Sequence, residues 1–116
     1  MDPHRWRLDG QLALVTGGSA GIGRAIAREL LGFGATVLIA ARNGDALEAA
    51  RDELADEFPD GDVRAFIADV VDEEQRREVL DWVEDQGEGL NILVNNAGGN
   101  VTRAANDYTE DAWREI

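Results

Sequence analysis

VTGGSAGIGRAIA, the stretch from Val15 to Ala27, holds four glycines within the seven residues Gly17–Gly23. A short apolar run, Leu12–Val15, leads into it and suits a strand buried on both faces. From about Gly21 the apolar residues recur at helical spacing instead. The stretch therefore predicts a strand, a glycine-rich turn and a helix in direct succession.

The predicted helix has one apolar face, which we expect to pack on the sheet. Arg24 and Arg28 lie on another side, and Gly32 and Gly34 end the helix. The apolar positions are Ile22, Ile26, Leu30 and Phe33.

Glycines between a buried strand and an amphipathic helix have a specific use. Unpaired backbone N–H groups and the positive end of the helix dipole point at one spot there, so an anion binds. Gly17 would make the turn, Gly21 would admit a pyrophosphate, and Gly23 would let the helix lie close to the sheet. The spacing G-x-x-x-G-x-G differs from the common dinucleotide fingerprint, and the chain has 13 glycines. On this stretch alone, a plain strand-to-helix turn remains an alternative.

The rest of the chain alternates strand-like and helix-like segments. Asn43 and Thr109 can cap helices, and Asp72 followed by Gln75 resembles a capping box. The further predicted strands are Ala35–Arg42, Val63–Asp69 and Leu90–Asn96. This order predicts an α/β fold with helices on both faces of a parallel sheet.

We expect residues 1–116 to form one domain, the N-terminal half of a Rossmann-like doubly wound sheet with strand order 3-2-1-4. A ligand crevice then lies between strands 1 and 4. The fourth strand, Leu90–Asn96, would be left as an apolar edge with open hydrogen-bonding groups. Self-association of the chain through this edge, or poor stability, is therefore expected.

Composition excludes several classes of function. The net charge is −13, and all 11 basic residues are arginine, so nucleic acid and anionic membranes are poor partners. The acidic surface serves solubility, or alternatively forms a functional patch. With no cysteine and a lone His4, neither a disulfide framework nor a metal site is expected. No apolar run suits a membrane span or a signal peptide, which favours a cytoplasmic protein.

Two motifs at the ends of predicted strands carry a resemblance to a known family. TGGSAGIG, Thr16–Gly23, and NNAG, Asn95–Gly98, resemble the short-chain dehydrogenase/reductase family. RWRLDGQLALVTGG and LNILVNNAG are similar in particular to its tropinone-reductase-like members, and the likeness runs from Arg5 to Ile116. The resemblance implies a nicotinamide dinucleotide cofactor.

The same resemblance assigns cofactor contacts. The residues that would wrap the phosphates and ribose are Gly17, Ser19, Ala20, Gly21, Ile22 and Gly23. Asn96, Ala97 and Gly98 would line the cofactor ribose and backbone, while Asn95 supports the strand. Gly99 and Asn100 would extend this loop toward the nicotinamide.

The end of the second strand sets the choice of cofactor in this family. Ala41 stands where an acidic residue would accept hydrogen bonds from the ribose of NAD, and Arg42 follows it. An arginine suited to a 2′-phosphate favours NADP. The alternatives are an Arg42 that is simply exposed, and NAD, because Ala20 stands where many NADP-preferring relatives have a basic residue.

Asp69 and Val70 resemble the pair that contacts the adenine in this family. The carboxylate would accept a hydrogen bond from the adenine amino group. The alternative is that Asp69 only caps a turn.

The catalytic residues of the family are not expected within this chain. A tyrosine that works near neutral pH needs a cation to lower its pKa, and the chain has no lysine, so Tyr108 is not that residue. We expect the catalytic Ser, Tyr and Lys after Ile116. The sequence thus predicts the cofactor-binding part of an NADP(H)-dependent oxidoreductase acting on an unknown small carbonyl or alcohol substrate. The alternative is a non-catalytic, stand-alone half-domain that binds NADP, FAD or another adenine nucleotide.

Overall fold

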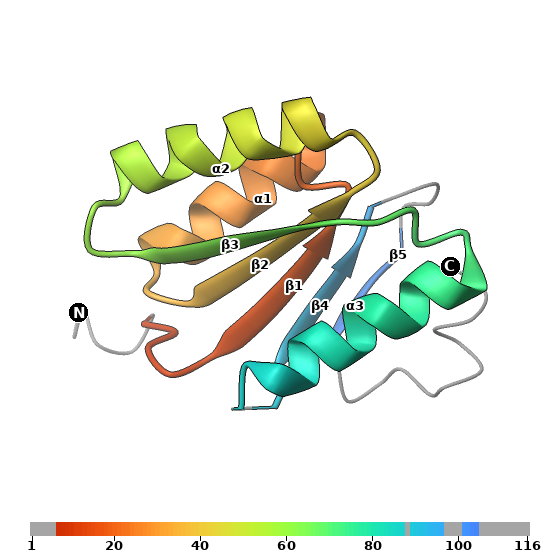
Figure 1. The fold of residues 1–116 in the computed structure, drawn as a ribbon. Helices are drawn as coiled ribbons and strands as arrows, with labels where there is room; N and C mark the ends of the chain where they lie inside the picture. The colour runs from red at the N-terminus through yellow and green to blue at the C-terminus, as the bar shows by residue number, and fades with distance from the viewer. Residues whose placement is uncertain (1–6, 88, 97–100, 105–116) are drawn as a thin grey trace.

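The computed structural model describes residues 7–87 and 89–96, and the backbone of 101–104. Its centre is a five-stranded sheet with the order β3-β2-β1-β4-β5 (Figure 1). The first four strands are parallel, which confirms the predicted order 3-2-1-4. The strands are β1 (Leu12–Thr16), β2 (Thr36–Ala41), β3 (Asp62–Ile67), β4 (Ile92–Asn95) and β5 (Val101–Ala104).

Three helices cover the two faces of the sheet. α1 (Gly21–Gly32) and α2 (Gly44–Glu57) lie side by side on one face, and α3 (Glu73–Asp85) lies on the other (Figure 1). Each helix follows a strand, so all three helices begin at the carboxyl edge of the sheet. This is the edge at which doubly wound folds bind their ligands.

The sheet is buried on both faces because its central strands are apolar throughout. In β1, Val15 belongs to the core under α1 and α2, whereas Leu12 and Leu14 belong to the core under α3. In β2, Ile39 and Leu38 divide in the same way, as alternation along a strand requires. All five residues of β1 are buried, so continuous apolar runs correctly predicted a sandwiched parallel sheet.

The predicted apolar face of α1 was wrong by about one residue. Ile22 is 68% exposed and Phe33 is 41% exposed, whereas Ile26 and Leu30 are partly buried against the core. The buried residues are Gly23, Ala27 and Leu31. Gly23 and Ala27 face the sheet because the start of the helix lies very close to it, whereas the larger Ile22 is exposed.

The prediction that the fourth strand would be left as an open edge was also wrong. β5 pairs with β4 in antiparallel register, with Asn95 opposite Val101 and Ile92 opposite Ala104. The chain therefore covers the β4 edge with its own backbone, and the basis for self-association through that edge is removed. The segment VTRA carries no strong strand signal, because it is short and only half apolar.

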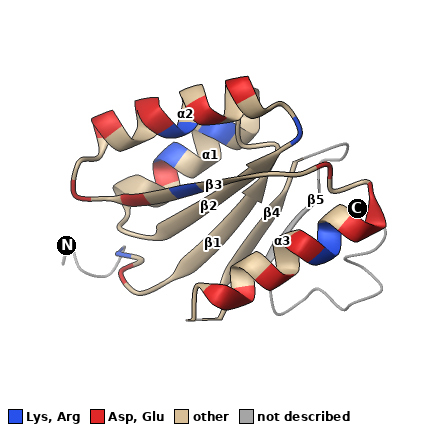
Figure 2. Cartoon of the chain, viewed as in Figure 1, with Lys and Arg blue, Asp and Glu red and all other residues tan. Residues whose placement is uncertain are grey.

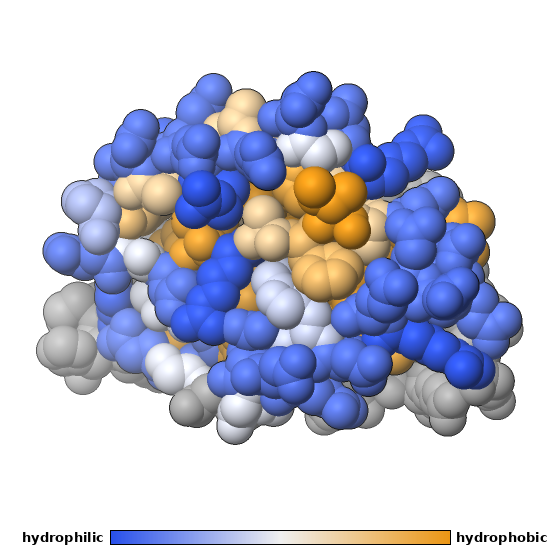
Figure 3. Space-filling view, viewed as in Figure 1, coloured by the Kyte–Doolittle hydropathy of each residue, from blue (hydrophilic) through white to orange (hydrophobic). Residues whose placement is uncertain are grey.

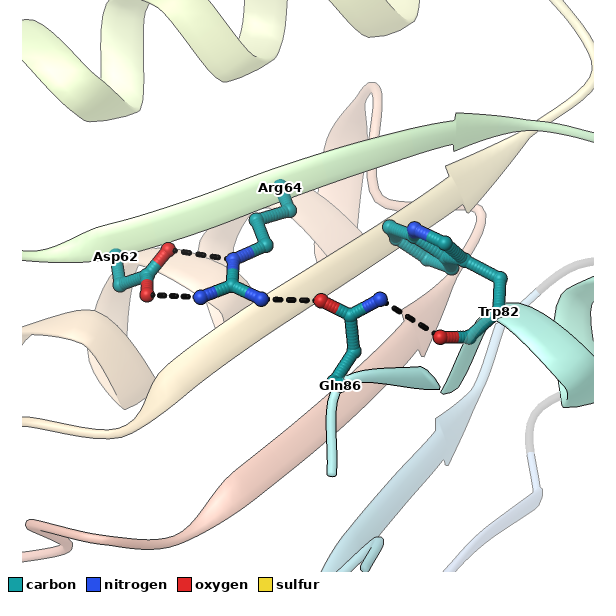
Figure 4. A network of polar contacts seen from close by, with 4 residues as sticks. All are labelled: Asp62, Arg64, Trp82 and Gln86. Carbon is teal, nitrogen blue, oxygen red and sulfur yellow. Dashed lines mark hydrogen bonds and ion pairs between the residues drawn. The ribbon is translucent and has the colours of Figure 1, made fainter. Parts of the chain in front are cut away.

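Polar contacts fix the edge strand β3 and the outer faces of the helices. Asp62 and Arg64 pair at the start of β3, Arg64 donates to Gln86, and Gln86 donates to the Trp82 carbonyl (Figure 4). Trp82 also packs on Phe66, with ring centroids 5.0 Å apart, as a packing residue rather than a site residue. This network ties β3 to the carboxyl end of α3.

Acidic residues dominate the outer surfaces of α2 and α3 (Figure 2). Arginines of α1 form ion pairs with glutamates of α2. Arg24 pairs with Glu53, and Arg28 pairs with Glu57.

Within the described residues, no helix is long and apolar enough to cross a membrane. Trp6, Tyr108, Trp113 and the helix predicted to begin at Thr109 lie outside the described residues.

Candidate functional site

A hollow of about 320 Å³ lies at the carboxyl ends of β1, β2 and β3. Figure 3 shows apolar side chains gathered over the carboxyl end of β3, between α2 and α3. Ile67, which ends β3, and Val71, in the turn that follows, are exposed apolar residues of this region. The lining residues are Gly17, Ser19, Ala40, Ala41, Arg42, Asn43, Ala68, Asp69, Val70 and Val71. An apolar wall with a few polar groups is typical of small-molecule sites.

The glycine turn has the geometry that its spacing predicts. Gly17 has φ 70°, and its N–H donates to the Ala40 carbonyl at 2.8 Å. Gly21 has φ 59°, and a Cβ there would meet no atom within 4 Å. Both angles are ones that side-chain-bearing residues rarely adopt. The chain therefore makes a sharp turn at Gly17 and leaves open space beside Gly21.

Gly18 and Gly23 are required for close packing instead. A Cβ at Gly23 would lie 2.3 Å from the Gly17 carbonyl oxygen and 2.9 Å from Nδ2 of Asn96. A Cβ at Gly18 would lie 2.8 Å from Cγ2 of Ile39. Gly23 thus brings the first turn of α1 against both the glycine turn and the end of β4. No role for Gly18 was predicted from the sequence, although its place in the glycine cluster beside Gly17 indicated a close approach of the backbone.

The amino end of α1 has no cap of its own. Its N-cap residue is Ala20, no side chain that the structure describes accepts from the first-turn N–H groups, and the first turn has no acidic residue. The other two helices differ, because Asn43 caps α2 and Asp72 caps α3 by accepting an N–H at 3.1 and 3.0 Å. The open N–H groups of α1 therefore remain available to an external anion.

Thr16 joins the ends of β1 and β4 beside this turn. Its hydroxyl donates to Oδ1 of Asn95 at 3.0 Å and accepts from the backbone N–H of Asn96 at 3.1 Å. Thr16 is fully buried, and Asn95 is 7% exposed, so these bonds are shielded from water. Asn95 supports the strand as expected, while Thr16 is a supporting residue that the motif reading missed.

Arg42 lies at the rim of the hollow, directly after β2. It is exposed and forms no ion pair with any residue that the structure describes. The side chain before it, Ala41, is only 9% exposed. Asn43 is engaged as the cap of α2, so Arg42 is the charged side chain that β2 offers to a ligand in the hollow.

Asp69 also lines the hollow and lies in the turn after β3. Its Oδ1 accepts the backbone N–H of Val71 at 3.1 Å, and its own N–H donates to Oε1 of Gln75 at 2.7 Å. The expected capping box is therefore only half formed. Asp72 accepts from the Gln75 N–H, but the Gln75 side chain reaches Asp69 rather than returning to Asp72. The Val70 side chain is buried, so this turn presents mainly its backbone and the Asp69 carboxylate.

The structure brings part of the predicted set of cofactor-binding residues together in the hollow. Six of them line the hollow, namely Gly17, Ser19, Ala41, Arg42, Asp69 and Val70. Ala20, Gly21 and Ile22 are exposed at the start of α1, next to the glycine turn. Ala97, Gly98, Gly99 and Asn100 lie outside the described residues. No group of His, Cys, Asp or Glu in the part of the chain that the structure describes could hold a metal ion.

The sequence matches the family model described as short chain dehydrogenase over residues 11–116. The chain belongs to the short-chain dehydrogenase family. Among curated members of the family, a tropinone reductase homolog of Arabidopsis thaliana is 41% identical over 114 residues, covering 97% of this chain and 41% of the relative. The resemblance of the two motifs to this family and to its tropinone-reductase branch is thus confirmed.

Solved structures of this family share the fold. An NADPH-bound short-chain oxidoreductase from Pseudomonas aeruginosa has a TM-score of 0.77 and 39% identity, over 95% of this chain and 43% of that one. L-Sorbose reductase from Gluconobacter frateurii, solved with NADPH and L-sorbose, has a TM-score of 0.76 and 32% identity, over 94% and 41%. The chain therefore spans about two fifths of the length of these relatives.

Proposed function

We propose that this chain is the NADP(H)-binding part of an oxidoreductase that transfers hydride between a nicotinamide and a carbonyl or alcohol substrate. The open amino end of α1 carries the proposal. Among the three described helices, it alone lacks a side-chain cap, and it begins beside the hollow at the carboxyl edge. A pyrophosphate would satisfy the N–H groups from which no described side chain accepts.

The space around this helix end supports a dinucleotide rather than a small anion. Gly21 has no side chain, and no described atom lies within 4 Å of the position that a Cβ would take there. A bound group could therefore approach the backbone at Gly21. Ser19 and Gly17 line the hollow that continues from the turn toward β2 and β3. A pyrophosphate over Gly21 would direct the adenosine into this hollow.

Two charged side chains that line the hollow would then contact the adenosine. Arg42 would contact a 2′-phosphate on the ribose. No carboxylate among the described residues pairs with its guanidinium. Asp69 would accept the adenine amino group. The NADPH complexes of the two solved relatives support NADP over NAD for this chain.

The nicotinamide would supply or accept hydride on the far side of the glycine turn. Asn96, held by Thr16, and the predicted contacts Ala97 and Gly98 would border the ribose on that side. We assign no catalytic role to the residues of this chain. The second candidate is a dinucleotide-binding module without activity. It is favoured by the position of the residues that line the hollow, all of which lie at the adenosine and pyrophosphate half of the site.

Calorimetric titration of NADP against the chain and its Ala20→Asp variant tests the proposal. The aspartate would cap α1 itself and repel the pyrophosphate, so we expect melting temperature to rise or hold while NADP affinity falls at least about tenfold. Ser19→Asp is unsuitable as a control because Ser19 lines the site, whereas Ala49→Asp adds the same charge to the exposed surface of α2. Equal NADP affinity in all three proteins, or no binding by the wild type, would refute the proposal.

A further inference from the structure

The turn that joins β3 to α3 is held in place by the first turn of α3. Gln75 Oε1 accepts the Asp69 N–H at 2.7 Å. Nη1 of Arg76 donates to the carbonyl oxygens of Val70 and Val71, at 3.0 and 3.1 Å. Asp69, Val70 and Val71 all line the hollow, so these bonds fix one of its walls from behind.

Arg76 is an unusual residue to find there. It is 7% exposed, it forms no ion pair with any residue in the described part of the chain, and its buried Nε has no hydrogen-bond partner. Burying a guanidinium without a carboxylate is unfavourable for stability. Core packing alone would be served better by an apolar side chain, which suggests that the charge has a use.

A chain of hydrogen bonds connects that charge to the Asp69 carboxylate. The Val70 carbonyl that accepts from Arg76 belongs to the same peptide group as the Val71 N–H. This N–H donates to Oδ1 of Asp69 at 3.1 Å. A cation on the carbonyl polarises the peptide and strengthens its N–H as a donor. Oδ1 is thereby fixed, while Oδ2 has no hydrogen-bond partner among the described residues and remains available to a ligand.

We propose that Arg76, with Gln75, is a positioning residue that orients Asp69 to select adenine over other purines. The inference rests on the proposed function, because it assumes that the hollow holds the adenosine of a dinucleotide. Neither residue touches the ligand. Arg76 fixes the peptide that orients Oδ1, Gln75 fixes the Asp69 N–H, and Asp69 Oδ2 then faces the exocyclic amino group of adenine. A hypoxanthine ring presents an oxygen at that position, which a carboxylate repels.

Selectivity between two ligands separates this role from simple stabilisation of the turn. The test compares the dissociation constants of NADP and of its hypoxanthine analogue, measured by calorimetry at a temperature where each variant is folded. The wild type should prefer NADP by about tenfold or more, the size expected of a hydrogen bond to a charged group. Arg76→Met keeps an apolar stem and removes the donors, so its preference should fall toward unity. A purely structural loss would weaken both ligands equally.

The neighbouring arginine gives a matched control. Arg77 is exposed and pairs with Glu73 on the surface of α3, so Arg77→Met should keep the wild-type preference. If Arg76→Met does not fold, Gln75→Met serves in its place and should also lose preference, whereas Gln75→Glu keeps an acceptor for the Asp69 N–H and should retain it.

A folded Arg76→Met or Gln75→Met variant with the wild-type preference would overturn the inference, as would a wild type that binds both dinucleotides equally. A wild type that binds neither would refute the proposed function, and the inference with it.

Discussion

α1 and α3 begin at the same edge of the same sheet, yet their amino ends are built in opposite ways. α3 is closed: Asp72 caps it, and Glu73 and Glu74 add negative charge to its first turn. α1 is open: Ala20 stands at its N-cap, and its first turn has no acidic residue. A helix end without a cap is normally less stable by about 1 kcal/mol, so the open end of α1 has a cost to the fold.

The difference shows how one fold can leave one helix end open to an anion while the other described helix ends are capped. Every helix that follows a parallel strand points its positive end toward the carboxyl edge. Where the chain supplies its own acceptor, as at α2 and α3, an external anion gains little. Where it supplies glycines and no acceptor, as at α1, the same dipole and N–H groups remain available to a ligand. The distribution of capping residues thus leaves the amino end of α1 as the one open to an external anion among the described helices.

The largest expected effect comes from filling the close approach at the start of α1. In Gly23→Ala, the new methyl group would lie 2.3 Å from the Gly17 carbonyl oxygen, which is backbone and cannot rotate away. Overpacking of this kind should lower the free energy of unfolding by about 2–3 kcal/mol, measured by urea denaturation. NADP affinity should fall as well, because the glycine turn must shift.

Gly21→Ala is the matched control for that change. Its methyl group would meet no protein atom within 4 Å, but φ is 59°, so the cost to stability should be about 1 kcal/mol from backbone strain alone. The methyl group would occupy the space proposed for the pyrophosphate, so NADP affinity should fall although the fold is retained. Equal loss of stability in the two variants would contradict the different roles assigned to the two glycines.

How much of this site the sequence could predict depended on the range of the interactions. The strand, turn and helix around Gly17 and Gly23 were predictable because backbone angles and close packing restrict those positions to glycine. The caps at Asn43 and Asp72 were predictable for the same local reason. The contacts of Thr16 with Asn95 and Asn96 join residues about 80 positions apart in the sequence, and no local pattern predicts them.

The wrong predictions have physical causes of the same kind. Helical spacing identified an apolar face on α1, but the close approach at Gly23 leaves no room there for a side chain, and the neighbouring Ile22 is exposed. An arginine in a charged helix is normally solvated, so nothing in the sequence marked Arg76 as buried. β5 was missed because a four-residue strand depends on the edge that receives it.

A second test removes the other anion contact proposed for the open site. Arg42→Ala should reduce the preference for NADP over NAD by about tenfold, because a guanidinium contributes a charge-assisted contact to the 2′-phosphate and none to a 2′-hydroxyl. Parallel calorimetric titrations of the two cofactors measure this ratio. Stability should not change, since Arg42 is exposed and without a described ion pair. An unaltered ratio would show that Arg42 does not select the cofactor.

A third test opens the closed helix. Asp72→Ala removes the acceptor of the Gln75 N–H and should lower the free energy of unfolding by about 1 kcal/mol. It should not create a second anion site, because Glu73 and Glu74 remain in the first turn of α3. Phosphate and NADP titrations should therefore match the wild type, and tighter phosphate binding would mean that the cap alone decides where an anion binds.

The smallest effect is expected at the far end of α3, where the Asp62–Arg64–Gln86 contacts join it to β3 (Figure 4). The side chains of the ion pair are 45% and 46% exposed, so water screens their attraction, and Arg64→Met should cost less than about 1 kcal/mol. The hydrogen bond with Asp62 raises the pKa of Arg64 above its already alkaline usual value. A raised folded-state pKa stabilises the protein below the unfolded-state value and loses that stabilisation only as pH rises beyond it. The stability difference between wild type and Arg64→Met should therefore be constant between about pH 6 and pH 9, which urea denaturation across that range would measure. A difference that grows within this range would mean that Arg64 interacts with a titrating group other than Asp62.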